Sequence, residues 1–247
     1  MTQAGTWWWI LLPYLSMLTF VVGCIWRWQY DRYGWTSRST ELQERSLLKW
    51  GSPIFHYSTF AAIGGHIIGI LIPQSFTLML GIPNDVYETF SGIAGSIAAI
   101  GVLIGAAFLV FRRTLVPRVR ATTSAVDYAV LILLAIVVLL GIYLTLGVQE
   151  IGGGYNYRVT VSPWFRSLFT GSPDVSSIQA APIMYQVHVT AAWFLYGLWP
   201  FSRLVHAFSY PLWYLWRPYI VYRSRKAVRP NEPGTGRRRW RRIAARY

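Results

Sequence analysis

The stretch DYAVLILLAIVVLLGIYLTLG, from Asp127 to Gly147, decides the class of fold. After Asp127 it carries no charged side chain, and crossing a hydrocarbon core takes about 20 apolar helical residues. Four other stretches are similarly long and apolar, so the sequence predicts an all-α integral membrane protein, a bundle of five transmembrane helices. The predicted helices cover residues 6–26, 53–73, 92–111, 127–147 and 182–208.

Composition agrees with this class. Of the 247 residues 54% are hydrophobic and 13% are charged, whereas about a quarter of the residues in soluble proteins are charged. A closed β-barrel is the other fold that satisfies every backbone group in lipid. Its strands read as alternating segments of about ten residues, and the apolar stretches here are continuous. The barrel is therefore excluded.

The basic residues are distributed unevenly along the chain. Of the 23, 21 lie in the segments 27–49, 112–120 and 203–247, which alternate with loops that hold only Arg158 and Arg166. By the positive-inside rule the N-terminus is predicted outside and the C-terminus in the cytoplasm, as an odd number of spans requires. This placement also argues against nucleic acid as the partner of a chain with net charge +14.

Residues 1–222 are predicted to form a single membrane domain, and 223–247 a basic cytoplasmic tail. The tail is interpreted either as a segment attracted to anionic lipid or as a docking segment for a soluble partner. Cys24 is the single cysteine, so the chain cannot form an internal disulfide, a four-thiolate iron–sulfur site or a CxxCH haem attachment. Any haem must be held without a covalent bond.

The four histidines all fall in two of the predicted helices. Because these two helices run in opposite directions, His56 and His206 are expected near the cytoplasm (the inner pair), and His66 and His188 near the outside (the outer pair). Two imidazoles that fill both axial positions suit a b-type haem that transfers electrons. The sequence therefore predicts two non-covalent b-type haems. The alternative is that the histidines act as hydrogen-bonding groups or as a proton relay.

The spacing within the two helices does not match. His56 and His66 are ten residues apart, about 15 Å along a helix, whereas His188 and His206 are eighteen apart, about 27 Å. The eighteen residues make five whole turns, which would place both histidines on one face of a continuous helix. Pro200 lies within this interval and can kink it.

Two arginines near the inner helix ends are candidates to bind haem propionates by charge-assisted hydrogen bonds. Arg203 lies three residues before His206, and Arg112 lies at the inner end of the third predicted helix.

Three motifs resemble the γ subunit of membrane-bound respiratory nitrate reductase, a dihaem cytochrome b. They are RWQYDRYGW at Arg27–Trp35, PRVRATTSAVD at Pro117–Asp127 and PFSRLVH at Pro200–His206. The likeness covers roughly residues 6–225. It implies an inner and an outer ligand pair at the same four histidines, in the cytoplasmic membrane of a bacterium or archaeon.

The resemblance also implies a function in anaerobic nitrate respiration. Menaquinol or ubiquinol is expected to be oxidised near the outer haem, with electrons passing inward to an iron–sulfur β subunit and a molybdenum α subunit that reduces nitrate. Gly65, His66 and Tyr87 are the quinol-site candidates. One member of this family has a lysine in the loop after the second helix that assists quinol binding; the matching position here is Tyr87, and no lysine lies between Gln74 and Ser91.

Two other functions remain open from sequence. A related dihaem cytochrome b could serve a sulfur or heterodisulfide redox complex. A proton-coupled transporter could use the histidines as a relay, but it should show broken helices or a repeat about the midplane.

Overall fold

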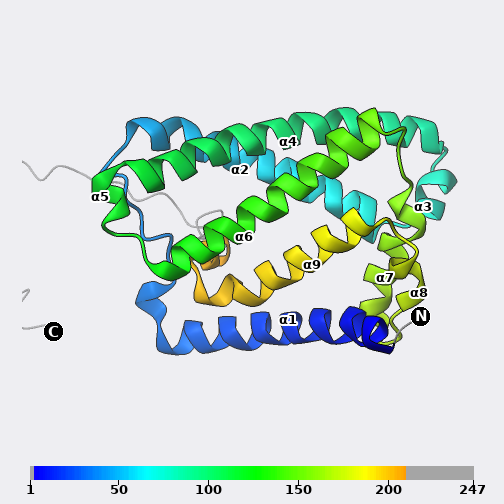
Figure 1. Cartoon of the computed structure of the whole chain (residues 1–247), viewed down its shortest axis with the longest axis horizontal. Helices are drawn as coiled ribbons and strands as arrows, with labels where there is room; N and C mark the ends of the chain where they lie inside the picture. Colours follow the sequence, from blue (N-terminus) through cyan, green and yellow to red (C-terminus); the bar gives the residue numbers. More distant parts are fainter. Residues whose placement is uncertain (1–2, 210–247) are drawn as a thin grey trace, which may run out of the picture. The chain divides into compact units, whose positions relative to one another are not determined.

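The long helices of the chain lie side by side (Figure 1). The computed structural model describes residues 3–209, in which every regular element is helical. The predicted tail, 223–247, lies outside the described residues. Four helical stretches are long and apolar enough to cross a membrane, which confirms an all-α protein of the membrane class: Gly5–Tyr30, Ser46–Leu71, Asn84–Leu115 and Ala125–Ile151.

The helices are named in chain order. They are α1 (Gln3–Tyr30), α2 (Ser46–His66), α3 (Gln74–Met79), α4 (Asn84–Leu115), α5 (Pro117–Arg120), α6 (Ala125–Ile142), α7 (Val161–Ser167), α8 (Val175–Gln179) and α9 (Ile183–Leu198). Two long helices end in π-helical turns, α2 in Ile67–Leu71 and α6 in Tyr143–Ile151.

The fifth predicted helix, 182–208, is not continuous. After α9 the chain forms a 3-10 turn at Trp199–Phe201, becomes extended at Ser202 (φ −112°, ψ 179°) and forms a second 3-10 segment at Arg203–Phe208. Pro200 explains the break, because it has no N–H to donate and its ring clashes with the carbonyl four residues earlier. The interruption falls where the sequence allows a kink, and the predicted helix 182–208 continues beyond Leu198 only as 3-10 segments.

Glycines bring α2 and α4 into close contact. A Cβ atom added to Gly105 would lie 2.6 Å from the Cα atom of Phe55, and one added to Gly51 would lie 2.7 Å from the Cβ atom of Phe108. At such distances only a glycine fits, and the two backbones approach as in small-residue packing of membrane helices. This contact fixes one face of α2 on α4.

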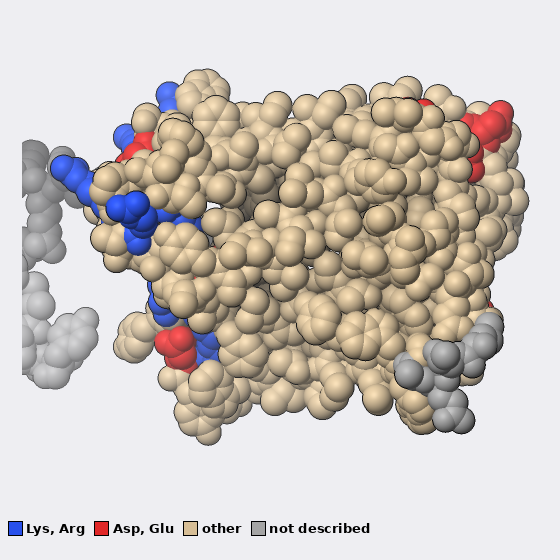
Figure 2. Space-filling model, viewed as in Figure 1, with Lys and Arg blue, Asp and Glu red and all other residues tan. Residues whose placement is uncertain are grey.

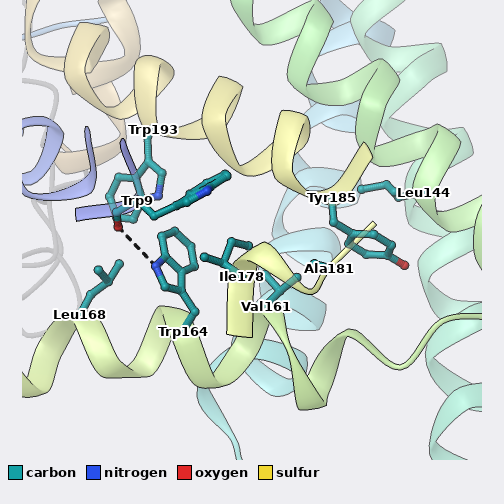
Figure 3. Close-up of a cluster of buried hydrophobic side chains, with 9 residues drawn as sticks. All are labelled: Trp9, Leu144, Val161, Trp164, Leu168, Ile178, Ala181, Tyr185 and Trp193. Carbon is teal, nitrogen blue, oxygen red and sulfur yellow. Dashed lines mark hydrogen bonds between the residues drawn. The ribbon is translucent and has the colours of Figure 1, made fainter. Parts of the chain in front are cut away.

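A cluster of buried apolar side chains, drawn in Figure 3, lies at the α3 end of the bundle, where α7 and α8 join α1 and α9 (Figure 1). The Trp164 side chain is fully buried, packs edge-on against Trp9 at 5.4 Å between ring centroids, and donates from Nε1 to the Trp9 carbonyl at 3.3 Å. Indole rings combine a large apolar area with one donor that needs a partner when buried. The loop before α9 is thus held against the bundle.

Charge and apolarity are separated on the surface. On the face shown in Figure 2, Lys and Arg side chains gather at the α5 end, and the belt between the two ends is uncharged. Large apolar side chains point outward from this belt; Leu18, Ile97 and Ile132 are each at least 60% exposed. A water-exposed surface of this kind would be unusual for a soluble monomer, but it suits contact with lipid.

Candidate haem sites

The four histidines form two facing pairs. His56 from α2 lies beside His206 from the last 3-10 segment, with ring centroids 5.9 Å apart and ring planes at 73°. His66, the last residue of α2, lies beside His188 of α9, with centroids 6.3 Å apart and planes at 28°. The structure brings together the same residues that antiparallel direction pairs in the sequence.

The separations fit one metal ion between each two rings. A metal binds an imidazole nitrogen at about 2 Å, and the ring centre lies about 1 Å beyond, so rings on opposite sides of one iron have centres about 6 Å apart. Within residues 3–209, no group of three or more His, Cys, Asp or Glu side chains is placed to hold a metal. Two protein ligands per site suit a macrocycle that supplies the other four.

Hydrogen bonds orient three of the four rings. In each of these the Nδ1 atom lies within 2.7 Å of a backbone carbonyl oxygen, to which only a protonated Nδ1 can donate. In the neutral form of such a ring, Nε2 is the nitrogen that has a lone pair for a metal. The acceptors are the carbonyls of Ser52 for His56, Ala62 for His66 and Arg203 for His206.

His188 differs from the other three. Its buried Nδ1 atom has no hydrogen-bond partner among the described residues. A Cβ atom at Gly141 on α6 would lie 3.3 Å from its Cε1 atom, so the ring packs against a glycine. A Cβ at Gly64 or Gly65, beside His66, would meet nothing within 4 Å. The residues around the outer pair therefore fit a flat group between α2 and α9.

The break after Leu198 also explains the unequal spacing of the histidines. The eighteen residues from His188 to His206 do not run straight along one axis, because the chain leaves the helix at Pro200 and turns at Ser202. His188 and His206 can therefore each lie opposite their partners His66 and His56 on α2, although the two sequence intervals differ. The expectation that His188 and His206 share one face of a continuous helix is wrong.

Arg203 makes four hydrogen bonds with protein groups. Its Nε and Nη2 atoms donate to the two carboxylate oxygens of Asp127 at 2.7 and 2.8 Å, and it also donates to the carbonyls of Arg38 and Thr122. These four hydrogen bonds occupy four of the five N–H groups of the guanidinium, so one N–H on Nη1 is left for the propionate predicted from the sequence. Because the Arg203 carbonyl accepts from His206, Asp127 holds the backbone that orients His206.

Arg112 is likewise engaged. It is 3% exposed and donates to Glu44 Oε2 at 2.7 Å, to the Glu44 carbonyl, and to the side chain and carbonyl of Thr40. It ties the α1–α2 loop to α4, and its role as a propionate ligand stays a prediction from the sequence. Burial acts to raise the pKa of Glu44, but hydrogen bonds from Ser46, the Leu47 N–H and Arg112 lower that pKa to about 2.

The loop before α9 caps the π-helical turn that follows His66. Three side chains of the loop donate to backbone carbonyls of this segment, which lack helical partners because the helix ends there. The acceptors are Gly69 at 3.0 Å, Ile70 at 2.8 Å and Ile72 at 3.3 Å. The donors are Ser162, Arg166 and Arg158, in that order. These contacts cannot be predicted from the sequence, because a polar residue in a long loop gives no indication of which distant carbonyl accepts its hydrogen bond.

Tyr87, a quinol-site candidate, lies beside this cap. Its hydroxyl is 3.4 Å from that of Tyr157, and the Arg158 guanidinium carbon is 4.0 Å from its ring centroid. A cation thus lies next to Tyr87, although the segment after α2 contains no lysine. One feature of the sequence indicates such a cation: Arg158 and Arg166 are the two basic residues that lie outside the basic segments 27–49, 112–120 and 203–247.

Comparison with known proteins identifies the family. The profile described as the nitrate reductase gamma subunit matches residues 5–225. The nitrate reductase gamma chain of Bacillus subtilis is 40% identical over 218 residues, which are 88% of this chain and 97% of that protein. Respiratory nitrate reductase 1 gamma chain of Escherichia coli is 30% identical over 217 residues, 87% of this chain and 95% of that one.

A longer relative matches as well. The nitrate reductase-like protein NarX of Mycobacterium tuberculosis is 42% identical over 234 residues, 93% of this chain, but the chain spans only 36% of its length. All these relatives are bacterial, and together with the apolar helices they indicate a multi-pass bacterial membrane protein. The chain belongs to the nitrate reductase gamma subunit family.

Proposed function

We propose that this chain is the membrane anchor and electron-transfer subunit of a respiratory nitrate reductase, and that it oxidises quinol. The observation that carries the proposal is the pair of facing histidine couples, with centroid separations of 5.9 and 6.3 Å, in a chain of the gamma subunit family. Two b-type haems, when bound there, supply one-electron carriers in series.

The residues of the chain perform two tasks in this proposal. His56 with His206, and His66 with His188, present neutral imidazole nitrogens to the two irons. Ser52, Ala62 and Arg203 fix three of the ring orientations through their carbonyls. A haem held by two histidines would have no position left for nitrate, so the chain would transfer electrons and nitrate would be reduced on another subunit.

We further propose five spans, with α9 and the 3-10 segments after it as the fifth, the N-terminus outside and the basic loops in the cytoplasm. Supporting this orientation is the gathering of Lys and Arg side chains at the α5 end (Figure 2). The proposed partners, an iron–sulfur β subunit and a molybdenum α subunit, would then bind at that end.

Quinol, menaquinol or ubiquinol, would be oxidised near the outer pair, where Gly65 and His66 are exposed. Each quinol yields two electrons and two protons, and nitrate takes up two of each to give nitrite and water. Protons left outside and electrons moved inward charge the membrane, at a cost of about 2.3 kcal/mol per electron per 100 mV. Redox energy is thereby converted into membrane potential.

A spectrum of membranes tests the proposal. We expect about two b-type haems per chain, reduced by menadiol and reoxidised by nitrate. Single replacement of His66 or His188 should remove one haem and keep the other. A chain without haem would favour the proton relay, and haem that is reoxidised by a disulfide and not by nitrate would favour the sulfur or heterodisulfide complex.

A further inference from the structure

Arg158 is a buried cation without an acidic partner. It is 4% exposed, and no carboxylate of the described residues lies within ion-pair distance of it. Its Nη1 atom donates to Thr77 Oγ1 at 3.1 Å and its Nη2 atom to the Ile72 carbonyl at 3.3 Å, but its buried Nε atom has no partner. An uncompensated buried charge is costly to fold, which points to a role beyond stability.

The remaining contact of Arg158 is with Tyr87. The guanidinium carbon lies 4.0 Å from the ring centroid, within the range of a cation–π interaction. Both groups are buried, so water screens this attraction little. Because the cation draws electron density from the ring, it makes the Tyr87 hydroxyl a stronger hydrogen-bond donor.

A continuous set of contacts links this pair to the outer histidines. The Tyr87 hydroxyl lies 3.4 Å from the Tyr157 hydroxyl, and Tyr157 packs against Gly69, three residues after His66. The Tyr157 ring also stacks on Tyr185 at 6.3 Å between centroids, and Tyr185 lies three residues before His188. Tyr87 and Arg158 are therefore held to both helices that carry the outer pair.

We propose that Arg158 is a positioning residue for quinol: it holds and polarises Tyr87, whose hydroxyl donates a hydrogen bond to an oxygen of the quinol head group. The inference rests on the proposed function and adds a residue to its quinol end. Burial and the hydrogen bond with Tyr87 raise the pKa of Tyr157, so Tyr157 keeps its proton and can donate to Tyr87. The Tyr87 proton is then available for a ligand.

The chain offers a matched control. Arg166 lies in the same loop, has no carboxylate partner among the described residues, and donates to the neighbouring Ile70 carbonyl at 2.8 Å, but it makes no cation–π contact with Tyr87. Loss of a loop cap should affect Arg158→Met and Arg166→Met alike. Loss of quinol positioning should affect Arg158→Met alone.

The test uses membranes that contain the full chain and its native partners. Menadiol-dependent haem reduction gives KM and kcat, and quenching of a fluorescent hydroxyquinoline analogue of quinol gives Kd. We expect Arg158→Met to raise both KM and Kd about tenfold, equivalent to about 1.4 kcal/mol, with kcat and haem content unchanged, because the cation–π contact is lost. Arg158→Lys should restore most of the affinity.

The role of the Tyr87 hydroxyl is tested by combination. If Arg158 acts through it, Arg158→Met in a Tyr87→Phe chain should add little to the loss that Tyr87→Phe causes alone. Equal losses in Arg158→Met and Arg166→Met, or full additivity with Tyr87→Phe, overturn the inference. Wild-type membranes whose haems menadiol does not reduce refute the proposed function instead, so the two failures are distinguishable.

Discussion

At the scale of single residues, Asp127 makes two sets of hydrogen bonds, of which the sequence indicates only one. Its Oδ2 atom accepts from the Ser124 N–H at 2.9 Å, completing a capping box at the start of α6, and both its oxygens accept from Arg203. The capping box is legible in the sequence as a serine three residues before an acid. The bond to Arg203 is not, because it joins residues 76 positions apart.

Asp127→Asn is expected to loosen the inner pair. The amide keeps the side-chain volume but replaces one acceptor oxygen with a donor and removes the charge opposite Arg203. We expect a loss of about 2–3 kcal/mol in the free energy of unfolding in detergent, and a changed spectrum of the haem proposed at the inner pair. Glu41→Gln is the control, because Glu41 pairs with Arg45 at an exposed site and should change stability by about 0.5 kcal/mol or less. Equal effects would contradict the positioning role.

Glu44 makes the stability of the folded chain depend on pH in the acid range. Its pKa of about 2 in the folded chain is below the ordinary 4.5, so its contribution to stability is complete above about pH 4.5 and is lost as the pH falls toward 2. Thermal unfolding in detergent between pH 6 and pH 3 should show this loss, and Glu44→Gln should flatten the dependence. If the variant shows the same loss of thermal stability between pH 6 and pH 3 as the wild type, Glu44 is not the cause of the pH dependence.

At the scale of elements, the sequence predicts helices well where hydropathy is continuous. The stretches around α1, α2, α4 and α6 are all found, because burial in lipid and the helical hydrogen-bond pattern demand the same apolar length. The π-helical ends of α2 and α6 were not predicted. One extra residue in a turn leaves hydropathy unchanged, and only distant contacts such as the Ser162 bond to Gly69 reveal it.

The close contact of α2 and α4 is open to a glycine test. A methyl group at Gly105 would meet the backbone of Phe55, which cannot move without shifting the neighbouring His56. Gly105→Ala should therefore lower the free energy of unfolding by about 1–3 kcal/mol and reduce occupancy of the haem proposed at the inner pair. Gly95→Ala on the same helix is the control, because its methyl group would meet only a side-chain methyl of Thr145, at 3.3 Å. Its thermal midpoint should stay close to that of the wild type.

At the scale of the whole molecule, the orientation rests on charge and is directly testable. In a Cys24→Ser background, a cysteine placed at exposed Asp174 should react with an impermeant maleimide added to intact cells. A cysteine at exposed Glu41 should react only after the membrane is opened. The reverse pattern would invert the proposed topology and move quinol oxidation to the other face.

The two ligand pairs also set an order of events during biogenesis. In each pair one histidine comes from α2 and the other from α9 or the 3-10 segment after it, so the second axial ligand is synthesised more than a hundred residues after the first. On the proposed ligation, neither prosthetic group can be clamped while the early helices stand alone in the membrane. Haem incorporation is then a late checkpoint, and a nascent chain arrested before residue 183 should carry none.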